Sequence, residues 1–260
     1  MGPTSTVENY LKAIHAGQSR LARADGDRDL VPMGQLSTAL GVVPGTATAM
    51  VKTLAEAGLA IYEPYAGVRL TPAGEKLAAA VLRRHRLVEL FLVQVMGMNW
   101  DEVHDEAEQL EHAVSDRLIE RIDAMLGHPA VDPHGDPIPD SDGVIHTPDL
   151  ATLLTCATNE PLRVSRVVDQ DATFLRFIEQ SHLKPGQPVL VEERDAAADR
   201  VTVRTDGASL ALGQRAASKV LVEPKPTGYP APSTAPSSAS NEAMRSSPAS
   251  SPAGGTEPKP

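Results

Sequence analysis

The sequence predicts an α+β protein with a helical first half, a small β-barrel in the second half and a disordered tail. Three observations indicate this. Apolar residues recur at helical spacing as far as Leu126, short runs rich in Val and Leu follow between residues 162 and 212, and Pro, Ser, Ala and Gly dominate from about Pro226. A tail of that composition cannot bury enough apolar surface to offset the entropy lost on ordering.

The first 75 residues have the element order of a winged helix-turn-helix. Three helices with helically spaced apolar residues are expected, at Val7–Ala24, Pro32–Leu40 and Pro44–Ala57. A tight turn at residues 41–43 separates the last two, and Thr46 or the residue before it is a candidate N-cap of the third. Gly58 suits the end of that helix, and residues 60–70 have the pattern of a β-hairpin.

Two long helices are expected next, from Pro72 to about Met96 and from Trp100 to Leu126. Prolines and glycines between Gly127 and Pro148 exclude a regular helix there and indicate a linker. Short strands separated by Gly or Asp turns then predict a β-barrel of roughly 75 residues, with strands at 162–168, 188–193, 200–205 and 209–212 and a helix at 173–181.

Composition limits the function classes. Net charge is −10, which argues mildly against DNA binding because phosphate contacts require Lys and Arg. No apolar run approaches the roughly 18–20 residues of a membrane helix, and residues 1–9 lack the pattern of a secretory signal. The one cysteine, Cys156, is expected to be a small core residue. A cytoplasmic protein without a membrane partner is the expectation.

The third helix would lie in the major groove of double-stranded DNA, with its N-terminal residues facing base edges. The candidate DNA contacts on it are Pro44, Gly45, Thr46, Thr48, Ala49 and Lys52. Tyr65 and Arg69 in the hairpin would meet the phosphate backbone. The alternative is a helical hairpin that packs on another surface, since residues 1–75 carry no basic stripe.

A metal site is indicated by the segment from His104 to His112. On one helix, His104, Glu108, Glu111 and His112 would share a face, where a divalent cation would relieve the repulsion between carboxylates. His85 and Glu89 form a second pair with helical spacing on the preceding helix. Nitrogen and oxygen ligands without a thiolate favour Mn²⁺ or Fe²⁺ over a structural zinc ion.

Several motifs resemble the diphtheria toxin repressor (DtxR) family of metalloregulators, and the likeness covers about residues 4–225. The segments that carry it are Glu8–Leu11, Gly58-Leu59, Leu70–Gly74, Arg84–Glu89, Val103–Ala107, Glu111–Asp116 and Asp132–Pro139. The resemblance is strongest to the manganese-dependent branch. It implies a winged-helix DNA-binding domain (1–75), a helical dimerisation and metal-binding domain with the linker (76–148), an SH3-like FeoA domain (149–225) and the tail (226–260).

The resemblance also assigns ligands. A primary regulatory site would use Asn9, Glu108, Glu111 and His112. A second site would use His85, Glu89 and His104, with Asp171 reaching over from the SH3-like domain. His134 lies where some manganese-branch members supply a further ligand. Iron-type members carry Cys at position 108, so Glu108 favours manganese.

Three residues depart from the family pattern. Position 9 is usually Met in iron-type and Asp in manganese-type members, and here Asn9 offers a neutral carbonyl. Lys12 stands where some manganese-type members have Glu, which argues against a closely spaced two-metal site. Phe174 stands where an iron-type member would offer Gln. Iron therefore stays open as the alternative metal.

The function implied is that of a homodimeric transcriptional repressor that binds operator DNA when loaded with Mn²⁺ or, as the alternative, Fe²⁺, and that controls metal-uptake genes. It would not be an enzyme. Two other classes are weighed against it. One is a metal-dependent hydrolase that uses the His/Glu cluster, for which no nucleophile motif is apparent. The other is an adaptor whose β-barrel binds a Pro-rich segment.

Overall fold

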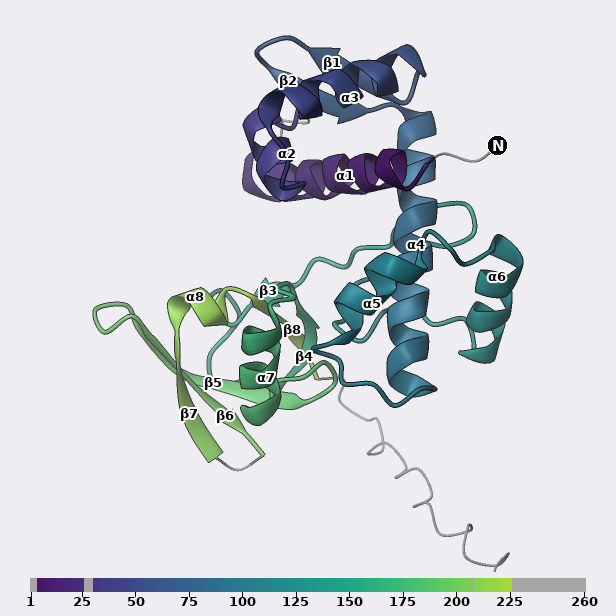
Figure 1. Ribbon diagram of the computed structural model, residues 1–260. Helices are drawn as coiled ribbons and strands as arrows, with labels where there is room; N and C mark the ends of the chain where they lie inside the picture. Colours follow the sequence, from purple (N-terminus) through teal and green to yellow (C-terminus); the bar gives the residue numbers. More distant parts are fainter. Residues whose placement is uncertain (1–3, 26–29, 207, 226–260) are drawn as a thin grey trace, which may run out of the picture. The chain divides into compact units, whose positions relative to one another are not determined.

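The computed structural model describes residues 4–25, 30–206 and 208–225 (Figure 1). The predicted tail from Pro226 lies outside the described residues. Helices occupy the first half and a β-sheet the second, so the predicted α+β class is confirmed. No helix in the described part of the chain is long and apolar enough to cross a membrane.

Residues 5–25 and 30–70 form the predicted winged helix-turn-helix. Its elements are α1 (Ser5–Asp25), α2 (Met33–Ala39), α3 (Pro44–Glu56), β1 (Ala60–Glu63) and β2 (Gly67–Leu70). The two strands pair antiparallel, with Ala60 opposite Leu70. Apolar faces of the three helices meet in one core that includes Leu11, Val51 and Leu54. Burial of these faces holds α3 with its outer side exposed.

The predicted capping of α3 by Thr46 is wrong. Val43 occupies the N-cap position, and no side chain caps the helix. Pro44 is the first helical residue, where its fixed φ suits the helix and its missing N–H costs nothing. Thr48 donates its hydroxyl back to the Pro44 carbonyl (2.9 Å). The first turn of α3 therefore leaves backbone N–H groups without an intramolecular side-chain cap.

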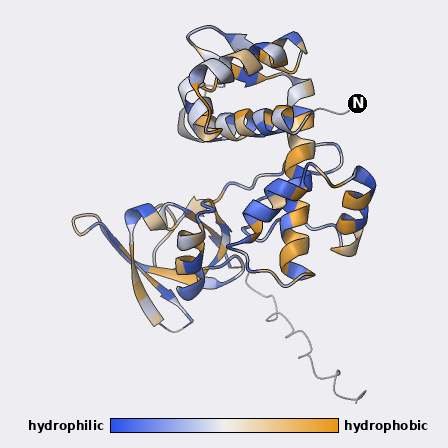
Figure 2. Ribbon diagram, in the orientation of Figure 1, coloured by the Kyte–Doolittle hydropathy of each residue, from blue (hydrophilic) through white to orange (hydrophobic). Residues whose placement is uncertain are grey.

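The long helix α4 (Pro72–Gln94) begins where the sequence predicts. Thr71 is its N-cap and accepts a hydrogen bond from the Gly74 N–H (3.2 Å). α1 packs against α4, and so do α5 (Val103–Leu110) and α6 (Asp116–Met125). Hydrophobic residues alternate with polar ones along the C-terminal half of α4 (Figure 2), and Leu87, Leu90 and Leu92 enter the second core.

The single helix predicted from Trp100 to Leu126 is wrong. Two helices replace it, because α5 ends at Leu110 and Ser115 starts α6 by accepting a hydrogen bond from the Leu118 N–H (3.4 Å). Glu111 keeps helical dihedral angles as the C-cap of α5. His112 lies in the turn that follows, so it does not share a helical face with His104.

The predicted linker has no helix, and part of it is well packed. Asp132 Oδ1 accepts hydrogen bonds from the backbone N–H groups of His134 (2.8 Å) and Asp136 (2.9 Å), which closes a tight turn. Both aspartates and His134 are buried. Gly135 has φ +84°, and a Cβ at this position would lie 2.0 Å from the Ser165 carbonyl oxygen. The turn is therefore pressed against strand β4.

The C-terminal domain is a six-stranded antiparallel sheet with the strand order β3-β8-β4-β5-β6-β7. Its elements are β3 (Ala151–Thr152), β4 (Leu162–Val167), α7 (Ala172–Gln180), β5 (Pro188–Asp195), β6 (Arg200–Thr205), β7 (Ala208–Gly213), α8 (Gln214–Ala217) and β8 (Val220–Pro224). Two strands, β3 and β8, were not predicted. Cys156 is buried against this core, as expected, and burial raises the pKa of its thiol.

Candidate metal centre

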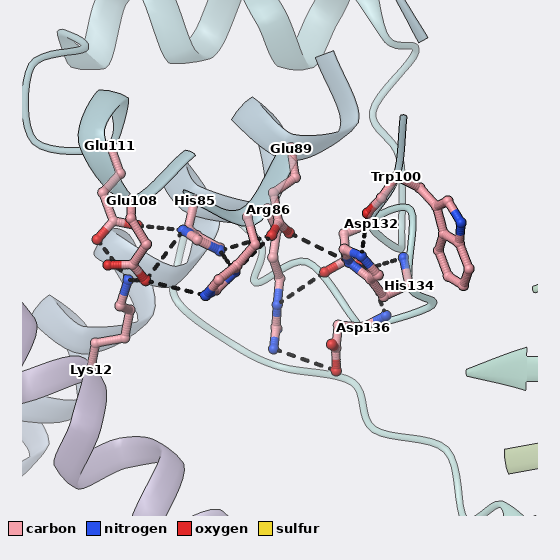
Figure 3. A network of polar contacts seen from close by, with 11 residues as sticks. Lys12, His85, Arg86, Glu89, Trp100, Glu108, Glu111, Asp132, His134 and Asp136 are labelled. Carbon is pink, nitrogen blue, oxygen red and sulfur yellow. Dashed lines mark hydrogen bonds and ion pairs between the residues drawn. The ribbon is translucent and has the colours of Figure 1, made fainter. Parts of the chain in front are cut away.

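A continuous polar network connects α1, α4, α5 and the 132–136 turn (Figure 3). His85 and Glu89 are one turn apart on α4 and point to one side, as their spacing predicts. Glu108 comes from α5, and Glu111 from the C-cap of α5. Lys12 reaches the network from α1. Elements far apart in the sequence thus bring their charged groups to one place.

His85 lies at the middle of this network. Its Nδ1 is 2.6 Å from Glu111 Oε2, and its Nε2 is 3.0 Å from Glu89 Oε1. His104 Nδ1 lies 3.2 Å from both His85 Nε2 and Glu89 Oε1. The imidazole therefore belongs to two sets of groups able to hold a metal ion: His85 with Glu89 and His104, and His85 with Glu108 and Glu111.

The charges around His85 set its ionisation. Burial alone would lower the pKa of His85, but hydrogen bonds with Glu111 and Glu89 raise it to about 9. Burial would raise the pKa of Glu89, yet hydrogen bonds with His104 and His85 lower it. Without a bound cation, Glu89 is thus ionised and His85 carries a proton at neutral pH.

Glu108 and Glu111 share an ammonium group. Lys12 Nζ donates to Glu108 Oε1 (2.5 Å) and to Glu111 Oε1 (2.7 Å). Glu111 is fully buried, whereas the Glu108 side chain is 36% exposed. Burial would raise the pKa of Glu111, but the His85 hydrogen bond and the Lys12 charge lower it. The buried carboxylate is held ionised by its two partners.

His112 joins this cluster from the turn after α5. Its Nδ1 is 2.5 Å from Glu8 Oε2, and its Nε2 lies 2.8 Å from Asn9 Oδ1 and 3.3 Å from Glu111 Oε1. Glu8 is itself buried and accepts from Arg84 (2.6 Å). Glu8 therefore fixes the ring through Nδ1 and leaves Nε2 facing Asn9 and Glu111.

A third set of potential ligands lies at the other end of the network, where Glu89, Asp132 and His134 are all buried. The ring of His134 stacks on Trp100, with centroids 5.4 Å apart, and its Nε2 donates to the Trp100 carbonyl (2.9 Å). The other ring nitrogen, Nδ1, points toward Glu89 Oε2 (3.9 Å). Among the described residues, His134 Nδ1, Glu89 Oε2 and Asp132 Oδ2 have no hydrogen-bond partner.

Burial and the neighbouring charges of Asp136 and Glu89 raise the pKa of Asp132 well above its ordinary value. Arg86 lies beside it, with Nε 3.7 Å from Asp132 Oδ2. Arg166 of β4 forms an ion pair with Asp136. The turn that carries His134 is therefore held between α4 and β4 by two arginines.

The structure brings together eight of the nine predicted ligands, namely Asn9, His85, Glu89, His104, Glu108, Glu111, His112 and His134. The ninth, Asp171, caps α7 by accepting from the Phe174 N–H (2.9 Å) and belongs to none of the ligand groups found among the described residues. Sequence reasoning did not select Asp132 or Glu8. Asp132 is two residues before His134, and that spacing was the available signal.

The predicted DNA-contact residues lie along α3 and the hairpin. Pro44, Gly45, Thr46, Ala49 and Lys52 are exposed, and Thr48 is half-buried. Tyr65 at the hairpin tip is fully exposed with φ 67°, and Arg69 on β2 is half-buried. These side chains lie on a single unit, the winged helix.

A winged helix joined to a helical domain that carries a buried His/Glu/Asp network defines the class of metal-responsive DNA-binding regulators. Three family models match the chain in succession: the iron-dependent repressor N-terminal DNA-binding domain (residues 4–68), the iron-dependent repressor metal-binding and dimerisation domain (71–140) and the FeoA domain (151–224). The chain belongs to the diphtheria toxin repressor family of transcriptional regulators.

Relatives are metal-dependent repressors. The chain is 32% identical over 120 residues to the transcriptional regulator MntR of Lysinibacillus sphaericus, which covers 46% of the chain and 81% of the relative. It is 29% identical over 230 residues to the diphtheria toxin repressor of Corynebacterium diphtheriae (84% and 96%). A solved manganese-dependent transcriptional repressor in complex with manganese is 41% identical, with a TM-score of 0.74 over 83% of this chain and 98% of that one.

Proposed function

We propose that the protein is a transcriptional repressor whose binding to operator DNA depends on a divalent cation, with Mn²⁺ as the first candidate. The observation that carries this proposal is the convergence of Asn9, Glu111 and His112. Asn9 belongs to the winged-helix domain, whereas Glu111 and His112 follow α5. A group of ligands drawn from both domains couples metal binding to the position of the DNA-contacting unit.

The ligand chemistry favours manganese over the softer metals. The proposed primary site contains Asn9, Glu108, Glu111 and His112, with His85 contacting Glu111 from α4. These ligands are oxygens and imidazole nitrogens, with no thiolate or thioether. The bound cation supplies positive charge between the buried carboxylates. Fe²⁺ is the alternative, because the matched family models describe iron-dependent repressors.

A second ion site is proposed around Glu89. His85 and His104 contact it from one side, and Asp132 and His134 lie on the other. Buried polar atoms without a hydrogen bond are costly, and a cation would satisfy Glu89 Oε2, Asp132 Oδ2 and His134 Nδ1 together. We do not assign Asp171 to this site, since its carboxylate caps α7.

The DNA surface is proposed to be the N-terminal half of α3 with the hairpin. The uncapped N-terminus of α3 offers backbone N–H groups to phosphate, which reduces the need for basic side chains in this acidic chain. Thr46, Ala49 and Lys52 are exposed on α3, and Tyr65 is exposed at the hairpin tip. Such contacts would allow a chain with a net charge of −10 to bind DNA.

The proposed assembly is a homodimer in the cytoplasm, where a repressor meets operator DNA. Several large apolar side chains of the helical domain are exposed in the single chain, among them Met96 (63%), Leu110 (38%), Leu118 (47%) and Met125 (67%). Exposed apolar side chains of this size favour a protein interface. The proposed domain division is the expected one, with boundaries near residues 75, 148 and 225.

The hydrolase alternative has little support. Catalysis would require ligands that open into a cleft with room for substrate. A cleft of about 1530 Å³ is bordered by residues 128–131, 137–141, 146–150 and part of β4, and none of the residues of the three ligand groups lines it. The family is one of transcriptional regulators, which agrees with a non-catalytic role.

The test is a gel shift with DNA from the region upstream of the gene, with Mn²⁺, Fe²⁺ under anaerobic conditions, Zn²⁺ or chelator in parallel. The proposal expects a shifted complex with Mn²⁺ that is lost in chelator. A complex that needs Fe²⁺ and ignores Mn²⁺ would favour the iron alternative. Binding that is equal with metal and with chelator would contradict metal-dependent repression.

A further inference from the structure

Lys12 is the one residue of α1 that bonds both carboxylates of the Glu108/Glu111 pair among the described residues (Figure 3). Its side chain is only 17% exposed, so the ammonium group is largely withdrawn from water. A lysine held in this way gives up much of its hydration, and two charge-assisted hydrogen bonds replace it. The contact is therefore a built part of the cluster and not an incidental surface ion pair.

The oxygens that Lys12 bonds are the oxygens that a metal ion would need. Glu111 Oε1 faces Lys12 and His112, and Glu111 Oε2 faces His85. Both oxygens of this buried carboxylate are thus already engaged. Glu108 Oε1 is also bonded to Lys12. A cation entering here meets a resident positive charge within a few ångströms, and the repulsion between like charges at that distance opposes its binding.

We propose that Lys12 is an internal competitor of the metal ion at the Glu108/Glu111 pair and thereby sets the metal concentration at which the site fills. This inference rests on the proposed function, since it assumes that a divalent cation binds these carboxylates. When the site is empty, the ammonium neutralises the pair and ties α1 to the end of α5. Filling the site requires the ammonium to leave at least one carboxylate.

The position of Lys12 on α1 gives the exchange a structural consequence. Asn9 lies three residues earlier on the same helix and contacts His112 through Oδ1 (2.8 Å). Both tethers therefore connect the same stretch of α1 with the end of α5. Displacement of Lys12 leaves the contacts of Asn9 and Glu8 with His112 as the remaining links between α1 and the end of α5. The winged helix thus stays attached to the metal-binding domain in both states, but through different atoms.

The test compares Mn²⁺ affinity by isothermal titration calorimetry, and the thermal midpoint in chelator, for the wild-type chain and Lys12→Met. The methionine keeps the apolar stem and removes the charge. Mn²⁺ binding is expected to tighten by about tenfold or more. The midpoint of the metal-free protein is expected to fall by about 5 °C or more, because a buried carboxylate loses its cation.

Three further proteins serve as controls. Lys12→Arg keeps the positive charge and should stay within about threefold of wild-type Mn²⁺ affinity. Lys76→Met removes an exposed lysine of α4 and should change neither quantity. Lys12→Gln, whose amide can still donate to a carboxylate, should tighten Mn²⁺ binding as Lys12→Met does, and it replaces that variant if circular dichroism shows that Lys12→Met is unfolded.

The outcomes separate this inference from the function on which it rests. Unchanged or weaker Mn²⁺ affinity in a folded Lys12→Met or Lys12→Gln variant would overturn the role of Lys12 while leaving the metal site intact. Failure of the wild-type chain and of every variant to bind Mn²⁺ or Fe²⁺ would instead overturn the proposed function. Tighter binding in the uncharged variants alone supports internal competition.

Discussion

The polar network has two ends that balance their charges differently: the α1 end, around Glu108 and Glu111, and the turn end, around Asp132 and His134. At the α1 end, both oxygens of Glu111 have partners, supplied by Lys12, His112 and His85. At the turn end, Glu89 Oε2, Asp132 Oδ2 and His134 Nδ1 have no hydrogen-bond partner among the described residues. The carboxylates of the α1 end are thus bonded by groups of the chain, whereas the turn end, although Arg86 and Arg166 lie beside its aspartates, keeps three ligand atoms without a hydrogen bond. The first suits a reversible response, and the second suits a retained ion that holds the fold together.

Removal of the charge at Glu111 should cause the largest loss of Mn²⁺ affinity at the α1 end. Glu111→Gln keeps the shape of the side chain but removes the buried carboxylate that faces three partners. We expect Mn²⁺ affinity to fall by more than the ~10–100-fold typical of outer-sphere partners, with loss of metal-dependent operator binding. Calorimetry and gel shift measure this. Glu106→Gln, on the exposed side of α5, is the matched control, and an unaltered metal response in Glu111→Gln would refute the site.

The next largest effect is expected on the stability of the metal-free protein as the pH changes. The pKa of His85 is raised to about 9 in the folded protein, above its ordinary value near 6.5. The protonated ring therefore stabilises the metal-free protein fully below pH 6.5, and this contribution is lost as the pH rises through about 9. Its size is on the order of 3 kcal/mol. Urea unfolding in chelator between pH 6.5 and 10 measures it, and His85→Gln should flatten the profile. A wild-type profile as flat as that of the variant would contradict the raised pKa.

A smaller loss of Mn²⁺ affinity is expected for Glu8→Gln. This buried carboxylate holds Nδ1 of His112 (2.5 Å) and so directs Nε2 toward Asn9 and Glu111. Glu8→Gln can still contact the ring, but it orients the imidazole less well and lowers its basicity. We expect Mn²⁺ affinity to fall by about tenfold with the number of bound ions unchanged. An affinity equal to wild type would show that the turn after α5 positions His112 without Glu8.

The smallest change in the Mn²⁺ affinity of the α1 end is expected from Asp132→Asn. Asp132 contacts neither Lys12 nor Glu111, so the affinity of the α1 end for Mn²⁺ should change by less than about threefold. The turn end should lose its ion, which lowers the number of ions bound per chain by one. Metal analysis after gel filtration gives that number. An unchanged ion count, or a large loss of affinity at the α1 end, would show that the two ends are not separate sites.

Much of the fold follows from local sequence signals. Thr71-Pro72 starts α4 as predicted, because the threonine hydroxyl caps the helix and proline suits its first position. The i, i+4 spacing of His85 and Glu89 placed both on one face. The break between α5 and α6 was missed, because residues 111–115 contain neither Gly nor Pro. Ser115 as the N-cap of α6 was the one local signal.

Most residues of the candidate site could be predicted from the sequence, but their connections could not. His112 was expected to share a helical face with Glu108, yet the turn after α5 carries it to Glu8 and Asn9 of α1. Asp132 was missed because its role depends on a turn that folds back against α4, and no periodic pattern encodes such a contact. Lys12 was noticed only as a departure from the family. Its bonds to two carboxylates depend on how α1 and α5 pack, and this is information beyond any single segment.

Trp100 is the only tryptophan in the 260-residue chain. Its ring stacks on His134, and its carbonyl accepts from the same imidazole. The tryptophan fluorescence of the protein therefore originates beside the turn end of the network and far along the chain from α1. A paramagnetic ion held by His134 would quench that emission, and an ion bound only near Lys12 would affect it less. The chain thus carries its own optical probe for telling which of the two ends fills first.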